Sequence, residues 1–145
     1  MIRLKQGDVV AVRIGPEQEC LCRILFKSSY FRHLALVASY GLLREAIAPA
    51  DQISKSKIIT LLYTTVRPSA VEGAWRRISS GVFLDNDREL SRRIVANEVW
   101  VEDQHCGPAS EEQLQCLPQM KVFMERIFVK RIAQDAQQGV QADRP

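Results

Sequence analysis

A chain of 145 residues, 46% of them hydrophobic and 26% charged, has the composition of a single globular domain that can bury a core without disulfides or a structural metal. No apolar run approaches the roughly 18 residues that a membrane helix needs. Residues 1–6 also lack the apolar core of a secretory signal. We therefore expect a cytoplasmic protein with no membrane partner and make no prediction of its oligomeric state.

The net charge of +3 is divided unevenly along the chain. Residues 1–80 hold 12 Lys and Arg against 6 Asp and Glu, a balance of +6, whereas residues 81–145 hold 8 against 11, a balance of −3. Such an asymmetry can orient a partner electrostatically. It falls short of the clustered basic face that nucleic-acid binding usually shows, so the sequence does not favour a nucleic-acid partner.

Three apolar runs near the N-terminus predict the centre of the fold. They cover residues 9–14, 20–27 and 34–40, and polar turns such as Gly15-Pro16 separate them. Three short strands joined by tight turns favour an antiparallel meander. Side chains two residues apart should share a face, as in the sets Val10, Val12 and Ile14; Cys20, Cys22, Ile24 and Phe26; and Leu34, Leu36, Ala38 and Tyr40.

The remaining pattern adds strands and helices around this meander. Residues 58–66 predict a central strand, because β-branched and aromatic residues occupy both of its faces. Apolar spacing predicts helices over 42–53 and 122–137. We expect loops at 70–73 and 85–89, one strand within 95–101, and a helix start at Ser110, where Ser110 and Gln113 form a capping box.

These elements predict the fold class. We expect one α+β domain over residues 1–137, built as a strongly bent antiparallel sheet or partial SH3-like barrel with peripheral helices. Residues 138–145 contain one large aliphatic side chain, Val140, and should form a frayed tail.

Candidate catalytic and metal-binding residues are few. The chain has four cysteines and two histidines: Cys20, Cys22, Cys106, Cys116, His33 and His105. Zinc sites usually use Cys-x₂₋₄-Cys or His-x₃₋₅-His pairs, whereas Cys20 and Cys22 are two residues apart in a predicted core strand. Nucleophilic catalysis needs a base facing the nucleophile, and His105 and Cys106 point apart in an extended chain. No glycine-rich nucleotide motif is present, so the sequence predicts no catalytic residue, metal ion or cofactor.

The two tryptophans are candidates for either the core or an interface. We expect Trp75 in the core. Trp100 lies among the carboxylates of Glu98, Glu102 and Asp103, and in a strand Glu98, Trp100 and Glu102 would share a face. These four residues are our candidate partner-binding patch; a buried Trp100 with solvated carboxylates is the alternative.

A family resemblance extends over most of the chain in short motifs. The opening Lys5-Gln6-Gly7-Asp8-Val9-Val10-Ala11-Val12, followed by Cys20-Leu21-Cys22-Arg23-Ile24-Leu25, resembles the immunity protein 26 family of bacterial polymorphic toxin systems. The similarity continues through residues 53–62, 75–79, 117–118 and 129–132. The chain departs from the family where Cys20-Leu21-Cys22 replaces an aromatic-glycine pair, and in its 16–19 turn. The resemblance implies a protein that binds and neutralises a cognate toxin domain without catalysis.

Two alternatives remain open. The Gly-Asp-Val-Val opening is also similar to small β-barrel ribonucleases of the MazF/PemK kind, although residues 32–37 lack their Arg-Pro step. A generic barrel that binds nucleic acid or peptide would carry a basic face built from Arg13, Arg23, Lys27 and Arg32.

Overall fold

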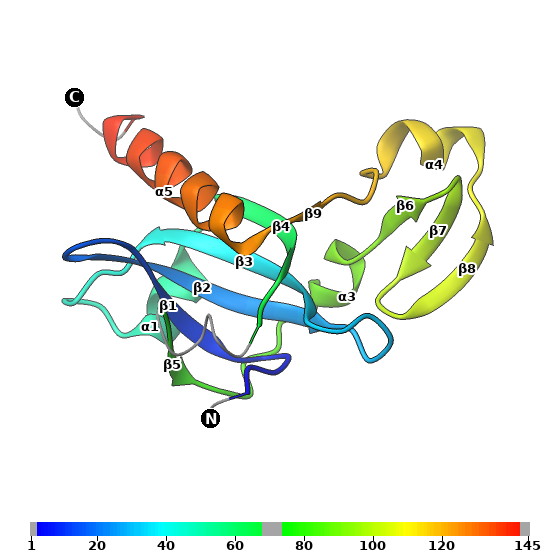
Figure 1. Ribbon diagram of the computed structural model, residues 1–145. Helices are drawn as coiled ribbons and strands as arrows, with labels where there is room; N and C mark the ends of the chain where they lie inside the picture. Colours follow the sequence, from blue (N-terminus) through cyan, green and yellow to red (C-terminus); the bar gives the residue numbers. More distant parts are fainter. Residues whose placement is uncertain (1–2, 68–73, 143–145) are drawn as a thin grey trace.

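The computed structural model describes residues 3–67 and 74–142, and within these the strands form two sheets. A six-stranded sheet in the order β5-β1-β2-β3-β4-β9, which we call the body sheet, carries most of the core, and a three-stranded sheet in the order β6-β7-β8 projects from it (Figure 1). The strands are β1 Val9–Gly15, β2 Gln18–Lys27, β3 Leu34–Leu42, β4 Thr60–Thr65, β5 Trp75–Ser79, β6 Arg93–Val95, β7 Glu98–Val101, β8 Gln104–Pro108 and β9 Val122–Phe123. The helices are α1 Pro49–Lys55, α3 Asp87–Leu90, α4 Glu111–Cys116 and α5 Glu125–Ala142.

The predicted α+β class with a bent sheet and peripheral helices is confirmed. Strands β1 to β4 form the expected antiparallel meander, β5 pairs with β1, and only the short β9 runs parallel to its neighbour β4. Among the described strands the body sheet ends at β5 and β9 and does not close into a barrel.

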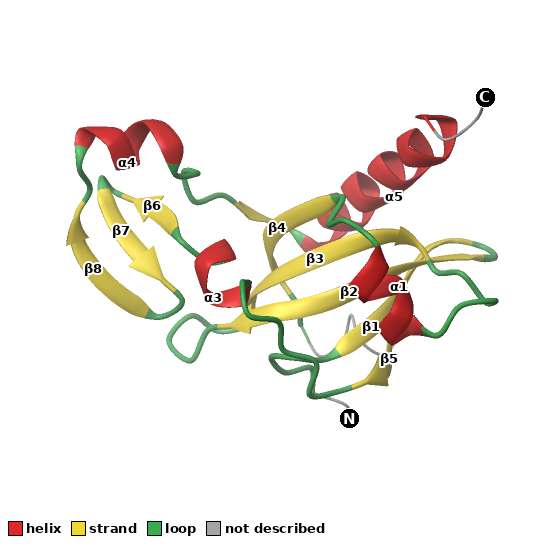
Figure 2. Ribbon diagram, turned by 180° about the vertical axis from the view of Figure 1, so that it is seen from behind, coloured by secondary structure: helices red, strands yellow, loops and turns green. Residues whose placement is uncertain are grey.

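Both faces of the body sheet are covered (Figures 1 and 2). On one face α5 packs Phe128 and Ile132, both without exposed surface, against Val10 and Cys22. These helix residues are four apart and therefore lie on the same side of α5. On the other face α1 contributes Ile53. It belongs to a cluster with Val9 of β1 and with four residues of β3, Leu34, Leu36, Ala38 and Tyr40. Apolar burial on both faces explains why the sequence of the meander reads as nearly continuous apolar runs.

The predicted faces hold for β1 and β3 and fail at one residue of β2. The register of the β2–β3 pair shifts between Ile24 and Phe26. This irregularity places Phe26 with the core on the α1 side, whereas Cys20, Cys22 and Ile24 stay with the core under α5. The expectation that Phe26 shares a face with these three residues was therefore wrong.

Both predicted helices have different bounds in the structure. The 42–53 prediction is wrong before residue 49, because Leu42 ends β3 and the Gln52 side chain fixes a turn after it. Gln52 Nε2 donates to the Leu42 carbonyl (2.8 Å), and the Arg44 backbone N–H donates to Gln52 Oε1 (3.1 Å). The 122–137 helix begins only at Glu125, since residues 122–123 pair as β9, and it continues to Ala142, into the segment expected as a tail.

Four further predictions concern the middle of the chain. The strand expected within 95–101 is confirmed as β7. Before it, Ala96 and Asn97 adopt positive φ (50° and 65°) and reverse the chain, so that β7 forms a hairpin with β6. The 85–89 loop contains the short helix α3. The capping box at Ser110 is confirmed, while the 70–73 loop lies outside the described residues.

Candidate partner-binding site

The candidate patch lies on the projecting unit formed by β6, β7, β8 and α4, which we call the arm. Arg93 joins the arm to the body sheet, and its side chain is almost completely buried. The guanidinium carbon lies 5.8 Å from the ring centre of Phe26 and 5.1 Å from that of Tyr63. Its Nη1 donates to the carbonyls of Ser91 (3.3 Å) and Glu102 (2.5 Å). Cation–π contact and two hydrogen bonds thus hold the first strand of the arm in place.

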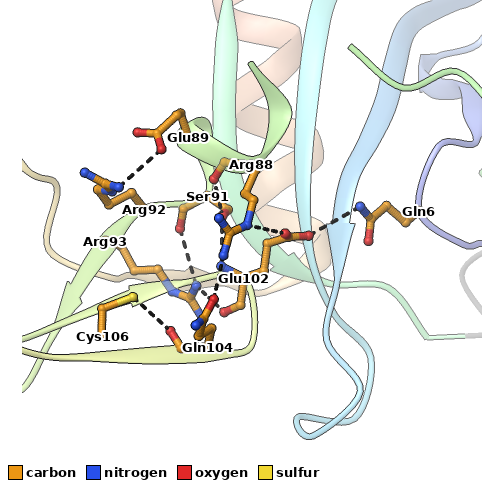
Figure 3. A network of polar contacts seen from close by, with 9 residues as sticks. All are labelled: Gln6, Arg88, Glu89, Ser91, Arg92, Arg93, Glu102, Gln104 and Cys106. Atoms are coloured by element: carbon orange, nitrogen blue, oxygen red, sulfur yellow. Dashed lines mark hydrogen bonds and ion pairs between the residues drawn. The ribbon is translucent and has the colours of Figure 1, made fainter. Parts of the chain in front are cut away.

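Glu102 and Asp103 form the turn between β7 and β8 and face the body sheet. The Glu102 carboxylate accepts from Gln6 Nε2 (3.4 Å) and lies 3.3 Å from Nε of Arg88, as Figure 3 shows. The Asp103 carboxylate accepts the Ser28 hydroxyl (2.6 Å) and the Ser29 backbone N–H (2.7 Å). Both carboxylates therefore fix the tip of the arm against the body sheet.

A buried ion pair supports α3, which leads into the arm. Arg23 has no exposed surface, and its two terminal nitrogens lie 2.6 and 2.7 Å from the Asp87 carboxylate oxygens. Burial lowers the pKa of Arg23, but hydrogen bonds to Asp87 and Tyr40 outweigh it and the pKa is raised. The basic face expected from Arg13, Arg23, Lys27 and Arg32 is therefore not formed. Arg23 is internal. Arg13 lies opposite Glu19 in the β1–β2 register, near the turn between these strands, whereas Lys27 is at the other end of β2.

Glu98, Trp100 and His105 share one face of the β7–β8 hairpin, which we call the Trp100 face. Strand alternation buries Val99 and Val101 and leaves Trp100 partly exposed. Trp100 pairs with His105 across the two strands, and their ring centres are 5.1 Å apart. His105 Nε2 lies 2.8 Å from the Glu98 carboxylate, and both side chains are close to half exposed. An aromatic ring, an imidazole and a carboxylate thus form one surface cluster.

Charge distinguishes the arm from the rest of the chain. Residues 94–120 contain no Lys or Arg, so five carboxylates give this stretch a charge of −5 and leave +8 on the remaining residues. The five are Glu98, Glu102, Asp103, Glu111 and Glu112. An acidic surface on a projecting unit attracts a basic partner and repels an acidic one.

The structure divides the predicted patch into two pairs. Glu98 and Trp100 lie together on the Trp100 face. Glu102 and Asp103 instead contact residues next to the body sheet, among them Gln6 and Ser28. Sequence reasoning missed His105 as a member of this cluster. The signal for it would have been a two-residue turn at 102–103, which places residue 105 opposite residue 100. Trp75 is in the core, as expected, and stacks on Phe128.

The thiols differ between the two parts of the molecule. Cys20 and Cys22 are buried in the body sheet, whereas Cys106 and Cys116 are exposed on the arm. Burial raises the pKa of the Cys20 thiol to about 11, and burial together with the neighbouring Cys20 raises the pKa of Cys22 further. Within residues 3–67 and 74–142, no group of three His, Cys, Asp or Glu side chains is arranged to hold a metal ion.

No family model, curated protein or solved structure matches the chain. In the described part of the chain, none of the helices has the length and apolar character to cross a bilayer.

Proposed function

We propose that this protein binds and neutralises a cognate bacterial toxin through a protein–protein contact made by the arm. The resemblance of the opening Gly7-Asp8 strand and of the later motifs to the immunity protein 26 family supports this proposal. The structural observation that supports it is the Trp100 face of the arm, where Trp100 lies partly exposed beside Glu98 and His105 on an acidic projecting unit.

The chemistry of this face suits a contact with a basic protein surface. A partly exposed tryptophan gains free energy when a partner buries the rest of its ring, and tryptophan is enriched among residues that dominate binding energy. The ring of Trp100 is already oriented by His105, and His105 by Glu98, so little side-chain freedom is lost on binding. The surrounding carboxylates would accelerate encounter with a basic toxin domain and disfavour acidic competitors.

Glu102 and Asp103 have a different role in this proposal. Their side chains hold the tip of the arm against Arg88 and Ser28, so they position Trp100 and Glu98 rather than meeting the toxin with their full charge. Substitution of either residue would change the placement of the arm. Glu98 and Trp100 are therefore the better targets for a binding experiment.

The proposal predicts that the neighbouring gene encodes a large secreted protein with a variable C-terminal domain. The test is co-expression of this chain with that C-terminal domain. We expect the wild-type protein to restore growth, and the double variant Trp100→Ala, Glu98→Lys to weaken binding of the purified toxin domain about 100-fold or more. Glu17→Lys makes the same charge change on the exposed β1–β2 turn and serves as the matched control, with binding within about twofold of wild type.

Two results would contradict the proposal in different ways. Failure of the wild-type chain to rescue cells, with no complex detected, would exclude this toxin as a partner. If the double variant still rescues cells, the proposed function would stand, but the toxin contact would not be on the Trp100 face of the arm.

A further inference from the structure

Basic side chains from three parts of the chain meet at the end of the body sheet where β2 ends. Lys27 is the last residue of β2, and its Nζ donates to the carbonyl of Leu4 (2.6 Å), which brings the N-terminal Arg3 close. The carbonyl of His33 accepts a hydrogen bond from the backbone N–H of Val66 (2.8 Å). The end of β4, and with it Arg67, therefore lies beside the β2–β3 loop. These links are invisible in the sequence, where the same residues are up to 64 positions apart.

The resulting electrostatic field is positive. Partial desolvation and the charges of Arg32, Lys27, Arg67 and Arg3 all lower the pKa of His33. Among the described residues, none of these four cations lies within 4.0 Å of a carboxylate oxygen. We call Arg3, Lys27, Arg32, His33 and Arg67 the basic surface.

Carboxylates near the basic surface are engaged by other groups. Asp103 accepts from Ser28 and Ser29, Glu102 pairs with Arg88, Asp8 is buried beside Arg77 at 3.6 Å, and Glu125 accepts from Trp75. Asp8 raises the pKa of Lys27, but burial and Arg3 outweigh it and the pKa is lowered. The basic surface thus keeps a net positive field that an anionic ligand can use.

Two exposed aromatic rings lie in the loop of this surface. Tyr30 is 76% exposed and Phe31 is 54% exposed. The Ser28 hydroxyl accepts the backbone N–H groups of both residues (3.1 and 3.0 Å) and itself donates to Asp103 of the arm. The loop is therefore held from inside and from the arm, and it presents both rings to solvent without a packing role that would explain them.

Two hollows contain cations of the basic surface. One, of about 460 Å³, is lined by Lys27, Tyr30 and the turn of the arm at Glu102 and Asp103. The other, of about 390 Å³, lies at the start of α5 and is lined by Arg67 and Arg126 among others. Tyr30 lines the first hollow together with Lys27. Arg67 of the second follows Val66, whose backbone N–H donates to the carbonyl of His33 at the end of the loop.

From this arrangement we propose that the basic surface and the Tyr30–Phe31 loop bind single-stranded nucleic acid. Arg3, Lys27, Arg32 and Arg67 would contact phosphates, and bases would stack on Tyr30 and Phe31, the combination by which single strands are held without sequence readout. A flat anionic bilayer fits less well, because its phosphates could meet the cations but it has no planar bases to stack on the two exposed rings. This inference does not depend on the proposed toxin contact, which uses the Trp100 face of the arm.

The test is fluorescence anisotropy of the full chain with labelled 12-nucleotide single strands of RNA and of DNA. We expect saturable binding whose logarithm falls with the logarithm of salt concentration with a slope of about −3, as contact with about four phosphates requires. Arg32→Glu with Arg67→Glu should weaken binding at least about tenfold and flatten the slope. Tyr30→Ala with Phe31→Ala should weaken binding about tenfold while leaving the slope unchanged, because stacking carries no charge.

Arg44→Glu is the matched control, since Arg44 is equally exposed but follows β3 at the opposite end of the body sheet. It should leave affinity within about twofold of wild type. Absence of saturable binding to either strand would overturn the proposal, as would equal losses in Arg44→Glu and the double charge variant. Binding to vesicles of anionic lipid that exceeds binding to the oligonucleotides would overturn it in favour of a membrane surface. Cleavage of the RNA strand, lost on His33→Ala, would instead assign the site to the ribonuclease alternative.

Discussion

The body sheet packs apolar side chains on both of its faces, whereas the three strands of the arm bury only Ile94, Val99 and Val101 among their large aliphatic residues. The arm depends instead on directed contacts: Arg93 between two aromatic rings, Glu102 with Arg88, and Asp103 with the β2–β3 loop. Apolar burial is additive over many residues and tolerates small changes, while a polar joint depends on a few groups. The loss of one such polar group should therefore destabilise the arm more than the body sheet.

The two tryptophans allow this difference to be measured. Trp75 is buried in the body sheet and Trp100 lies on the arm, so Trp100→Phe and Trp75→Phe give proteins whose remaining tryptophan reports on one part only. In the unchanged background we expect both probes to unfold at the same urea concentration, because the arm folds against the body sheet.

The largest effect should follow from Phe128→Ala. Phe128 is fully buried between α5 and the body sheet and stacks on Trp75 with ring centres 5.7 Å apart. Removal of this ring should lower the free energy of unfolding by about 3–5 kcal/mol, in urea titrations followed by either tryptophan. Its neighbour Ile127 is 47% exposed on the same helix, and Ile127→Ala should change stability by no more than about 0.5 kcal/mol. Similar losses in the two variants would mean that α5 does not cover the core as described.

A smaller and more local effect should follow from Arg93→Ala. This change removes the cation from between Phe26 and Tyr63 and leaves two carbonyls of the joint without their donor. We expect a loss of about 2–3 kcal/mol that appears first in the Trp100 signal, so that the arm unfolds at lower urea than the body. The matched control is Arg92→Ala, because Arg92 is partly exposed and pairs only with Glu89. If the Trp75 and Trp100 signals shift to lower urea together, the arm and the body sheet unfold as one unit.

Sequence patterns predict the parts of this molecule that rest on apolar burial. The meander, the strand over 58–66, the core position of Trp75 and the capping box at Ser110 are all local patterns, and the structure contains them. In the arm the pattern predicts β7 within 95–101 but not its hairpin with β6, because Ala96-Asn97 lacks the glycine that usually marks a tight hairpin turn.

Contacts between distant residues could not be predicted in the same way. Arg23 and Asp87 are 64 positions apart, and only the fold makes Arg23 an internal residue rather than part of a surface. The same holds for His105 beside Trp100 and for Arg67 beside His33, each of which depends on strand register. In both candidate sites the residue types were visible, and their grouping was not.

The smallest effect concerns a carboxylate of the body rather than of the arm, since the arm keeps Glu98 exposed while Glu125 lies partly buried under Trp75. Burial raises the pKa of Glu125, and the hydrogen bond from Trp75 Nε1 and the charge of Arg67 offset this only in part. The folded state therefore holds its proton more tightly than the unfolded chain. This stabilising term is complete below the ordinary pKa of a glutamate and is lost as pH rises through the higher folded value.

Glu125→Gln isolates this term, because glutamine cannot ionise but still accepts from Trp75 Nε1. We expect the variant to match wild type at pH 3.5 and to exceed it by about a few tenths of a kcal/mol at pH 7, a small value because the side chain is partly exposed. Urea midpoints of the two proteins at both pH values measure the difference. A variant that is less stable than wild type at pH 7 would show that attraction between Glu125 and Arg67 outweighs the cost of burial. It would also mean that the body, like the arm, uses its carboxylates to hold neighbouring elements together.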